Sequence, residues 1–122
     1  MITIKKFNYE IGKLGEDLVA THLKEKGYYI LERNFTCSIG EIDIIAKKDN
    51  ILCFVEVKSR YNLSFGYPCE SITGKKVRKI KKIALWYISK YKIKNTDFRF
   101  DVAEVYFEKN NELMINIIQN AF

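Results

Sequence analysis

The sequence is poor in the residues from which several common functional sites are built. It contains one histidine and three cysteines, and no two cysteines form a C-x-x-C pair. Zinc sites and Ser-His-Asp mechanisms draw on clusters of these residues, so the composition argues against both. Cys53 lies in an apolar run, where a reduced cysteine behaves as a small hydrophobic side chain. This cysteine usage is typical of a reducing cytoplasm.

Long apolar stretches and targeting signals are also missing. The first ten residues, MITIKKFNYE, lack the apolar core of a signal peptide. No apolar run approaches about 18 residues, the length that a membrane-spanning helix needs. We expect a cytoplasmic protein that does not associate with membranes.

The chain does have enough apolar residues for one core, together with an excess of positive charge. Its 122 residues suit a single domain over 1–122, and 48% hydrophobic residues argue against disorder. The formal net charge of +6 fits a polyanionic partner such as nucleic acid. Ordinary solubility charge explains the same excess equally well.

Hydrophobic periodicity and turn residues predict seven elements. Helices are expected over 9–26 and 72–91, where apolar residues recur at helical spacing. Strands rich in β-branched and aromatic residues are expected at 28–36, 39–47, 51–59, 98–108 and 112–118. Asp49-Asn50 and Asn110-Asn111 are expected to be tight turns, and 61–70 a loop. The order αβββαββ predicts one mixed α/β domain.

The two strands that flank the Asp49-Asn50 turn carry acidic residues inside apolar runs. Desolvating a carboxylate costs several kcal/mol, so such acids need a partner. A two-residue turn sets an antiparallel register that places Asp43 opposite Glu56. The same register places Glu41 opposite Lys58. Because opposed Cβ atoms lie roughly 4.5–5.5 Å apart and side chains alternate faces, Asp43, Glu56 and Lys58 are expected to gather.

Two carboxylates at this separation need a proton, a cationic side chain or a metal ion. Mg²⁺ prefers oxygen ligands from one or two carboxylates, with waters and substrate phosphate completing its shell. An ammonium such as that of Lys58 can orient a water or stabilise charge on a phosphate under attack. The alternative is a buried salt bridge from Lys58. The acids indicate a metal site at Asp43 and Glu56.

A second pattern is the basic start of the predicted second helix. Six of the eight residues in KKVRKIKK, 75–82, are basic. At helical spacing one arc, opposite the expected core face, carries Trp86 together with Lys75, Arg78, Lys79, Lys82 and Lys90. Basic residues beside an aromatic ring can hold phosphates and stack on a base. A solvated helix face would show the same run.

The chain resembles the YraN family of small bacterial proteins. That family is assigned to the restriction-endonuclease-like, or PD-(D/E)xK, superfamily, near the archaeal Holliday-junction resolvases. A lone E-x-K is weak, but the ordered set of segments is specific for the family. The segments are IGKLGEDLVATHLKEKGYYILERN (11–34), GEIDIIA (40–46), FVEVKSR (54–60), ESITGKKVRKI (70–80), FRFDVAEV (98–105) and the terminal NAF.

The resemblance implies an αβββαβ core, with a mixed central sheet flanked by helices, to which the last strand is an addition. It implies an active site formed by an acid on the first helix, an aspartate on the second strand and an E-x-K motif on the third. The matching residues are Glu16, Asp43, Glu56 and Lys58. On spacing alone Glu16 is an ordinary boundary residue of its helix, so its role as a third metal ligand rests on the resemblance.

The sequence departs from the resemblance at two places. Ile42 stands where the superfamily's name has proline, as is usual in the resolvase-like branch. Val77 follows Lys76 where family members commonly have glutamine, so any role of that glutamine is absent. Lys76 remains a candidate phosphate ligand.

We therefore expect a Mg²⁺- or Mn²⁺-dependent phosphodiesterase that acts on nucleic acid, in particular structured or branched DNA. The expected metal ligands are Asp43, Glu56 and Glu16, and Lys58 is expected to position water and stabilise the transition state. The residues expected to bind nucleic acid are Arg60, Lys75, Lys76, Arg78, Lys79 and Lys82. The alternatives are a nucleic-acid-binding protein without catalysis and a module that docks an acidic protein. Resolvase-like relatives act as dimers, so a homodimer is an expectation of the resemblance alone.

Overall fold

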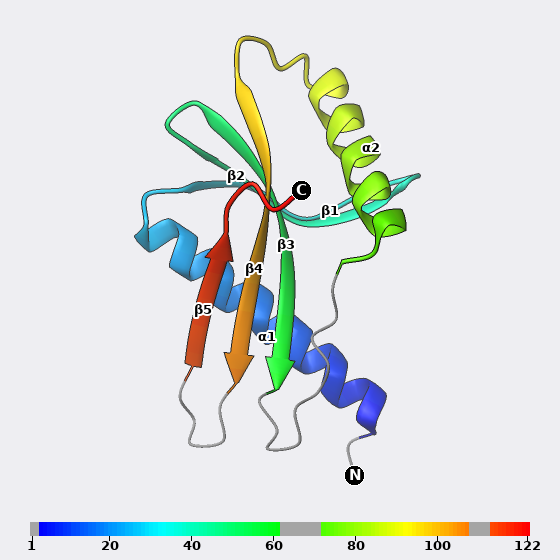
Figure 1. Cartoon of the computed structure of the whole chain (residues 1–122), viewed down its shortest axis with the longest axis vertical. Coiled ribbons are helices and arrows are strands. Elements are labelled where there is room, and N and C mark those ends of the chain that lie inside the picture. Colours follow the sequence, from blue (N-terminus) through cyan, green and yellow to red (C-terminus); the bar gives the residue numbers. More distant parts are fainter. Residues whose placement is uncertain (1–2, 62–71, 108–112) are drawn as a thin grey trace.

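The computed structural model in Figure 1 describes residues 3–61, 72–107 and 113–122. Helices and strands follow one another in the predicted order αβββαββ. The elements are α1 (Ile4–Glu25), β1 (Tyr29–Cys37), β2 (Gly40–Lys48), β3 (Ile51–Tyr61), α2 (Gly74–Lys90), β4 (Asp97–Phe107) and β5 (Leu113–Ile118). No helix in these described stretches is long and apolar enough to cross a membrane.

The five strands form one mixed sheet in the order β1-β2-β3-β4-β5. β3 and β4 run parallel, whereas the other neighbouring pairs are antiparallel. Parallel neighbours need a crossover connection, and α2 lies in the connection between β3 and β4. The arrangement confirms a mixed α/β fold with an αβββαβ core and an added C-terminal strand.

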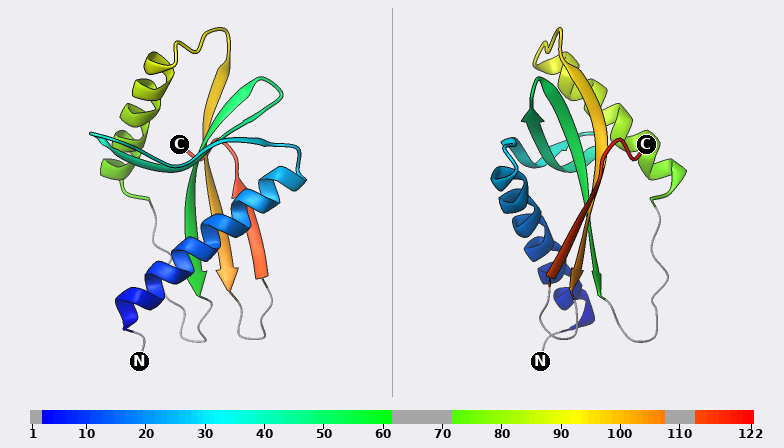
Figure 2. Two further views of the ribbon diagram at one scale, coloured as in Figure 1. Left: turned by 180° about the vertical axis from the view of Figure 1, so that it is seen from behind. Right: turned by 60° about the vertical axis from the view of Figure 1, so that its left-hand side comes forward.

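The two helices cover opposite faces of the sheet (Figure 2). On the α1 face, Val19 and Leu23 belong to one buried apolar cluster. On the α2 face, Ile83 and Phe54 belong to a second. Each fully buried side chain of this kind contributes roughly 1.5–3 kcal/mol, so the two clusters hold both helices on the sheet. The middle parts of β2 and β3 are therefore buried on both faces of the sheet.

The first helix begins earlier than predicted. It starts at Ile4, because the hydroxyl of Thr3 accepts a hydrogen bond of 3.1 Å from the backbone N–H of Lys6 and caps the helix. Ile4 is 81% exposed, so the first turn lacks the buried stripe on which the prediction of a start at residue 9 relied. Further along, a Cβ on Gly15 would overlap the hydroxyl of Ser59, so a glycine is needed where α1 crosses β3.

The turn between β2 and β3 is the predicted one. Asp49 and Asn50 have φ angles of 49° and 63°, the left-handed conformation that a type I′ turn requires at both central residues. Lys48 pairs with Ile51, as the predicted register requires. The predicted Asn110-Asn111 turn and nearly all of the predicted loop at 61–70 lie outside the described residues; Tyr61 itself ends β3.

Candidate functional site

The β2–β3 hairpin brings Asp43 and Glu56 together just beyond its last paired residues. Pairing continues from the turn as far as Ile44 opposite Val55, and the same register places Asp43 beside Glu56. There Asp43 Oδ2 accepts a hydrogen bond of 2.8 Å from the backbone N–H of Val57. A side-chain acceptor thus takes over where the backbone ladder between β2 and β3 ends, and it orients the Asp43 carboxylate next to Glu56.

The predicted pairing of Glu41 with Lys58 is wrong. Glu41 pairs with Thr36 of β1, and Lys58 pairs with Glu104 of β4. The reason is that the β2–β3 ladder ends at Ile44 and Val55. Beyond this point, within the described residues, β2 pairs only with β1, and β3 only with β4.

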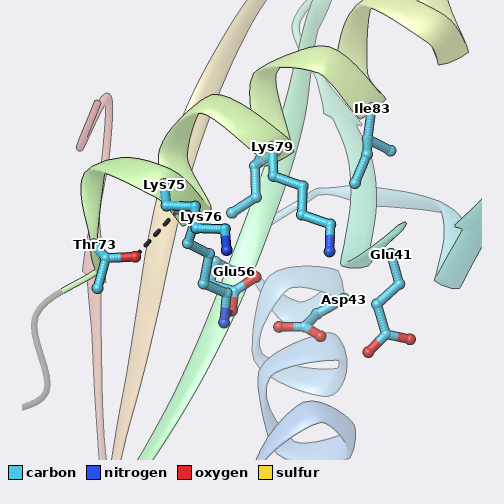
Figure 3. A pocket seen from close by; sticks show the side chains of 9 residues that line it. Glu41, Asp43, Glu56, Thr73, Lys75, Lys76, Lys79 and Ile83 are labelled. Carbon is cyan, nitrogen blue, oxygen red and sulfur yellow. Dashed lines mark hydrogen bonds and ion pairs between the residues drawn. The ribbon is translucent and has the colours of Figure 1, made fainter. Parts of the chain in front are cut away.

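Acids from the hairpin and lysines from α2 face each other across a cavity of about 370 Å³ (Figure 3). Ile80 and Ile83 of α2 form an apolar part of its wall. The charged residues that line it are Glu41, Asp43, Glu56, Lys75, Lys76 and Lys79. The cavity therefore offers carboxylates on one side and ammonium groups on the other, which suits an anionic ligand that also binds a cation.

Glu56 is the most deeply buried of these acids, and it has two lysine partners. Its side chain is 7% exposed, and Lys76 Nζ lies 2.5 Å from its Oε1. Lys58 Nζ lies 3.9 Å from the same oxygen. Burial alone would lower the pKa of Lys76, but the hydrogen bond and charge of Glu56 outweigh it and raise that pKa. Lys58, the partner expected from the sequence, is thus the more distant of the two.

The carboxyl group of Asp43 has an increased affinity for a proton. Burial, followed by the negative charge of Glu56, raises the pKa of Asp43 from 3.8 to about 7. The hydrogen bond from Val57 and the charge of Lys76 act in the opposite direction but do not cancel the rise. Near neutral pH the pair can therefore accept a proton or a metal ion in exchange.

Glu16 approaches the site from α1. Burial raises its pKa, while Lys13 and Arg33 oppose the rise. Its charge acts on Asp43 as well. In the amide orientation that satisfies both neighbours, Asn34 donates a hydrogen bond to Glu16 Oε1 and accepts one from Lys13 Nζ. Glu16 thus lies near Asp43 and has its own hydrogen-bonding partner, Asn34, on β1.

The donor set suits a metal with few protein ligands. Within the described residues, no three histidine, cysteine, aspartate or glutamate side chains are placed to hold a metal ion together. Asp43 and Glu56 alone match Mg²⁺ or Mn²⁺, which are commonly held by one or two carboxylates with waters and phosphate. The role of Glu16 as a third ligand stays a prediction.

The basic residues expected to bind nucleic acid do not all lie at this cavity. Lys75, Lys76 and Lys79 line it, whereas Arg78 and Lys82 are exposed on α2 but do not belong to its lining. The α2 helix begins at Gly74, and the hydroxyl of Thr73 accepts a hydrogen bond of 3.2 Å from the backbone N–H of Lys76. This cap fixes the turn that carries the lysines nearest to the acids.

Arg60 and Trp86 have partners elsewhere in the fold. Arg60 Nε lies 2.9 Å from Glu104 Oε2 of β4, and the Tyr106 hydroxyl donates to the same oxygen. Trp86 packs on Phe35 with a centroid separation of 5.8 Å, so it forms part of the apolar contact between α2 and β1. Trp86 also borders the basic arc, because Lys90 Nζ lies 4.9 Å from the centre of its ring, so its half-buried ring has the apolar core on one side and a basic residue of α2 on the other.

A second cavity of about 290 Å³ lies beside the first. Lys58 connects the two, because it contacts Glu56 in the first and lines the second. Its wall is mainly apolar, with Val77 from α2 and Phe122 from the C-terminal end. Arg60 and Glu104 add an ion pair to its lining. The Lys58–Glu56 contact thus links the linings of the two cavities.

One buried acid was missed altogether by reasoning from the sequence. Asp101 of β4 is 1% exposed, and Arg99 Nε lies 3.0 Å from both of its carboxylate oxygens. The backbone N–H of Asn120 donates to Asp101 at 2.9 Å, and Arg99 also donates to the hydroxyl of Tyr28 at 2.8 Å. The i, i+2 spacing of an arginine and an aspartate in a strand places both on one face and could have revealed the pair.

Comparison with known proteins identifies relatives along nearly the whole chain. Residues 15–105 match the uncharacterised protein family UPF0102. A UPF0102 protein of Caldicellulosiruptor saccharolyticus is 51% identical over 114 residues, which cover 93% of this chain and 97% of the relative. One from Clostridioides difficile is 52% identical over 115 residues, covering 94% and 98%. One from Clostridium perfringens is 50% identical over 120 residues and covers 98% of both chains. The chain belongs to the UPF0102 family.

Proposed function

We infer that this protein is a divalent-metal-dependent nuclease that hydrolyses phosphodiester bonds of nucleic acid. The observation that carries the proposal is the placement of Asp43 and Glu56 in one cavity, opposite three lysines of α2. Acids suit the metal and lysines suit the phosphates on either side of the bond to be cut. Membership of the YraN branch of the restriction-endonuclease-like superfamily is part of the proposal, and the αβββαβ order of elements supports it.

Each group at the site has a distinct role in this proposal. Asp43 and Glu56 would hold Mg²⁺ or Mn²⁺, which would supply a Lewis acid at the phosphate. Lys58, 3.9 Å from Glu56 Oε1, orients the attacking water and stabilises the charge that develops on the phosphate. Lys75 and Lys79 hold neighbouring phosphates. Water adds its oxygen to phosphorus and releases a proton to solvent, the bond from phosphorus to one ester oxygen breaks, and the departing oxygen takes up a proton from solvent.

Cleavage assays on defined substrates test this function. Duplex, single-stranded and four-way-junction DNA and single-stranded RNA are incubated with the protein and Mg²⁺ or Mn²⁺. We expect metal-dependent cleavage that is lost in Asp43→Asn. Lys58→Ala should bind substrate but cleave it ~10²-fold more slowly, as for other lost electrostatic stabilisers of a transition state. Lys94→Ala, remote from the cavity lining, is the matched control.

Two results would contradict the assignment. Undiminished cleavage by Asp43→Asn or Lys58→Ala would remove these residues from the mechanism. Metal-independent cleavage would point to another site.

A nucleic-acid-binding protein without catalysis is the second candidate. The observation that favours it is the ion pair of Lys76 with Glu56, which already neutralises the buried acid. Binding of all substrates by the wild type with cleavage of none would establish this alternative. The same samples, analysed by sedimentation with and without junction DNA, test the homodimer expected from the resemblance to resolvases.

A further inference from the structure

The ammonium group of Lys76 occupies the position beside Glu56 where a metal ion would bind. Its Nζ lies 2.5 Å from Glu56 Oε1, much closer than Lys58 Nζ at 3.9 Å. Figure 3 shows the Lys76 side chain reaching from α2 to the hairpin acids. An ammonium at hydrogen-bond distance and a metal ion cannot share this oxygen without strong repulsion between two cations. The contact therefore competes with any metal at Glu56.

The two partners in this contact differ in their freedom to move. The Glu56 side chain is 7% exposed and belongs to a central strand, whereas the Lys76 side chain is 43% exposed. Lysine has a long flexible stem and a point charge, so its ammonium can turn outward at little cost in packing. The backbone of Lys76 stays in place, because Thr73 caps the helix at this residue. Only the tip of the side chain has to exchange partners.

We propose that Lys76 is a positioning residue that fills the metal position until a phosphate draws its ammonium away from Glu56. This role rests on the proposed nuclease function. A phosphate at the cavity offers Lys76 a second anionic partner, and its departure leaves Asp43 and Glu56 in need of another cation. Metal and nucleic acid then assist each other's binding, and the assistance is reciprocal because it is a coupling between two equilibria.

The size of the effect follows from the fraction of molecules in which Lys76 has turned away. If that fraction is about one tenth, the apparent metal affinity is about tenfold weaker than the affinity of the open site. Removing the ammonium should restore the missing tenfold. A lysine that serves only as a phosphate ligand would leave metal affinity unchanged when it is replaced.

Calorimetric titration with Mn²⁺ in the absence of nucleic acid tests the competition. We expect Lys76→Met to bind Mn²⁺ about tenfold more tightly than the wild type. Lys81→Met is the matched control, because Lys81 is an exposed lysine of the same helix that does not line the cavity. It should change Mn²⁺ affinity less than twofold. Asp43→Asn should lose binding. Circular dichroism checks that each variant is folded. If Lys76→Met does not fold, Lys76→Gln replaces it in the titration.

A second titration tests the coupling. A single-stranded phosphorothioate DNA ten-mer, which resists hydrolysis, is added before Mn²⁺. Mn²⁺ affinity should rise severalfold in the wild type but not in Lys76→Met, where no ammonium remains to be displaced.

The outcomes separate this role from the function on which it rests. Equal Mn²⁺ affinity of the wild type and Lys76→Met, with loss in Asp43→Asn, would overturn the role of Lys76 and leave the metal site intact. Weaker binding by Lys76→Met would overturn it too. Failure of every protein to bind Mn²⁺ would overturn both proposals.

Discussion

The sheet contains two buried acids on adjacent strands, and their surroundings differ. Asp101 lies on the α1 face beside Val55, and Glu56 lies on the α2 face. The partners of Asp101 are the guanidinium of Arg99 and the backbone N–H of Asn120. The partners of Glu56 are two lysine ammonium groups, that of Lys76 at the wall of the first cavity and that of Lys58 at the wall of the second. The chain itself fixes the backbone amide that binds Asp101, whereas Lys76, the nearer partner of Glu56, is 43% exposed and can turn outward.

This difference separates a structural acid from a candidate functional one. Burial alone does not do so, because both residues are almost inaccessible. A guanidinium in a fixed fork and a backbone amide hold one geometry, whereas a lysine tip is a movable point charge. Exchangeable partners next to a cavity are what a site needs in order to trade a side-chain cation for a metal ion.

The largest effect on stability should follow from breaking the closed cluster. Asp101→Ala leaves Arg99 without its carboxylate and removes the acceptor for Asn120, so we expect the free energy of unfolding to fall by about 3–5 kcal/mol. Glu56→Gln keeps the shape of the side chain and one acceptor oxygen, and Lys76, which is 43% exposed, can turn to solvent, so we expect a smaller loss of about 1–2 kcal/mol. Urea denaturation measures both. Equal losses in the free energy of unfolding would mean that both acids have a structural role.

A smaller effect, of opposite sign, is expected at Asp43. Its folded-state pKa is about 7 and its ordinary value 3.8, so between these pH values the folded protein binds more protons than the unfolded one. The contribution of Asp43 to stability therefore falls as the pH rises from about 4 to 7 and stays low above it. Asp43→Asn should be ~1–3 kcal/mol more stable than the wild type at pH 8.

The measurement for Asp43 is the difference between the two proteins at each pH. Urea denaturation of wild type and Asp43→Asn is followed from pH 4 to 8 with EDTA present. The difference should vanish near pH 4, where Asp43 is protonated in the folded protein. A constant difference across this range would show that the carboxylate is not the cause.

The smallest effect per residue is expected on the salt dependence of DNA binding, when surface lysines of the two regions are replaced. Replacing Lys75 and Lys79, which line the cavity, with glutamine should reduce the log–log salt slope of duplex DNA binding by about 0.9 for each phosphate that is no longer neutralised. Lys48 and Lys94 are matched controls; Lys48 lies 5.1 Å from the ring of Tyr28, beside the Asp101 cluster. Fluorescence anisotropy at several salt concentrations measures the slopes. Equal slopes for both double variants would show that charge acts without regard to place.

Local rules were enough to predict the hairpin and its acids. Asp49 and Asn50 tolerate positive φ angles, and strand alternation then places Asp43 next to Glu56. The start of α1 was missed because its first turn is exposed and carries no buried stripe. The Lys76–Glu56 contact depends on how α2 docks on the sheet, which no spacing within α2 or β3 encodes.

The β2–β3 hairpin ties the site to the core in a way that constrains insertions and deletions. Ile45 is paired with Phe54, and both are buried under α2 in the same register that sets Asp43 beside Glu56. Adding or removing one residue in the turn would carry Ile45 out of its core position together with Asp43 out of the site. We expect such variants to lose stability as well as the acidic pair. The packing of the core therefore constrains the length of this hairpin, and the same constraint keeps Asp43 beside Glu56.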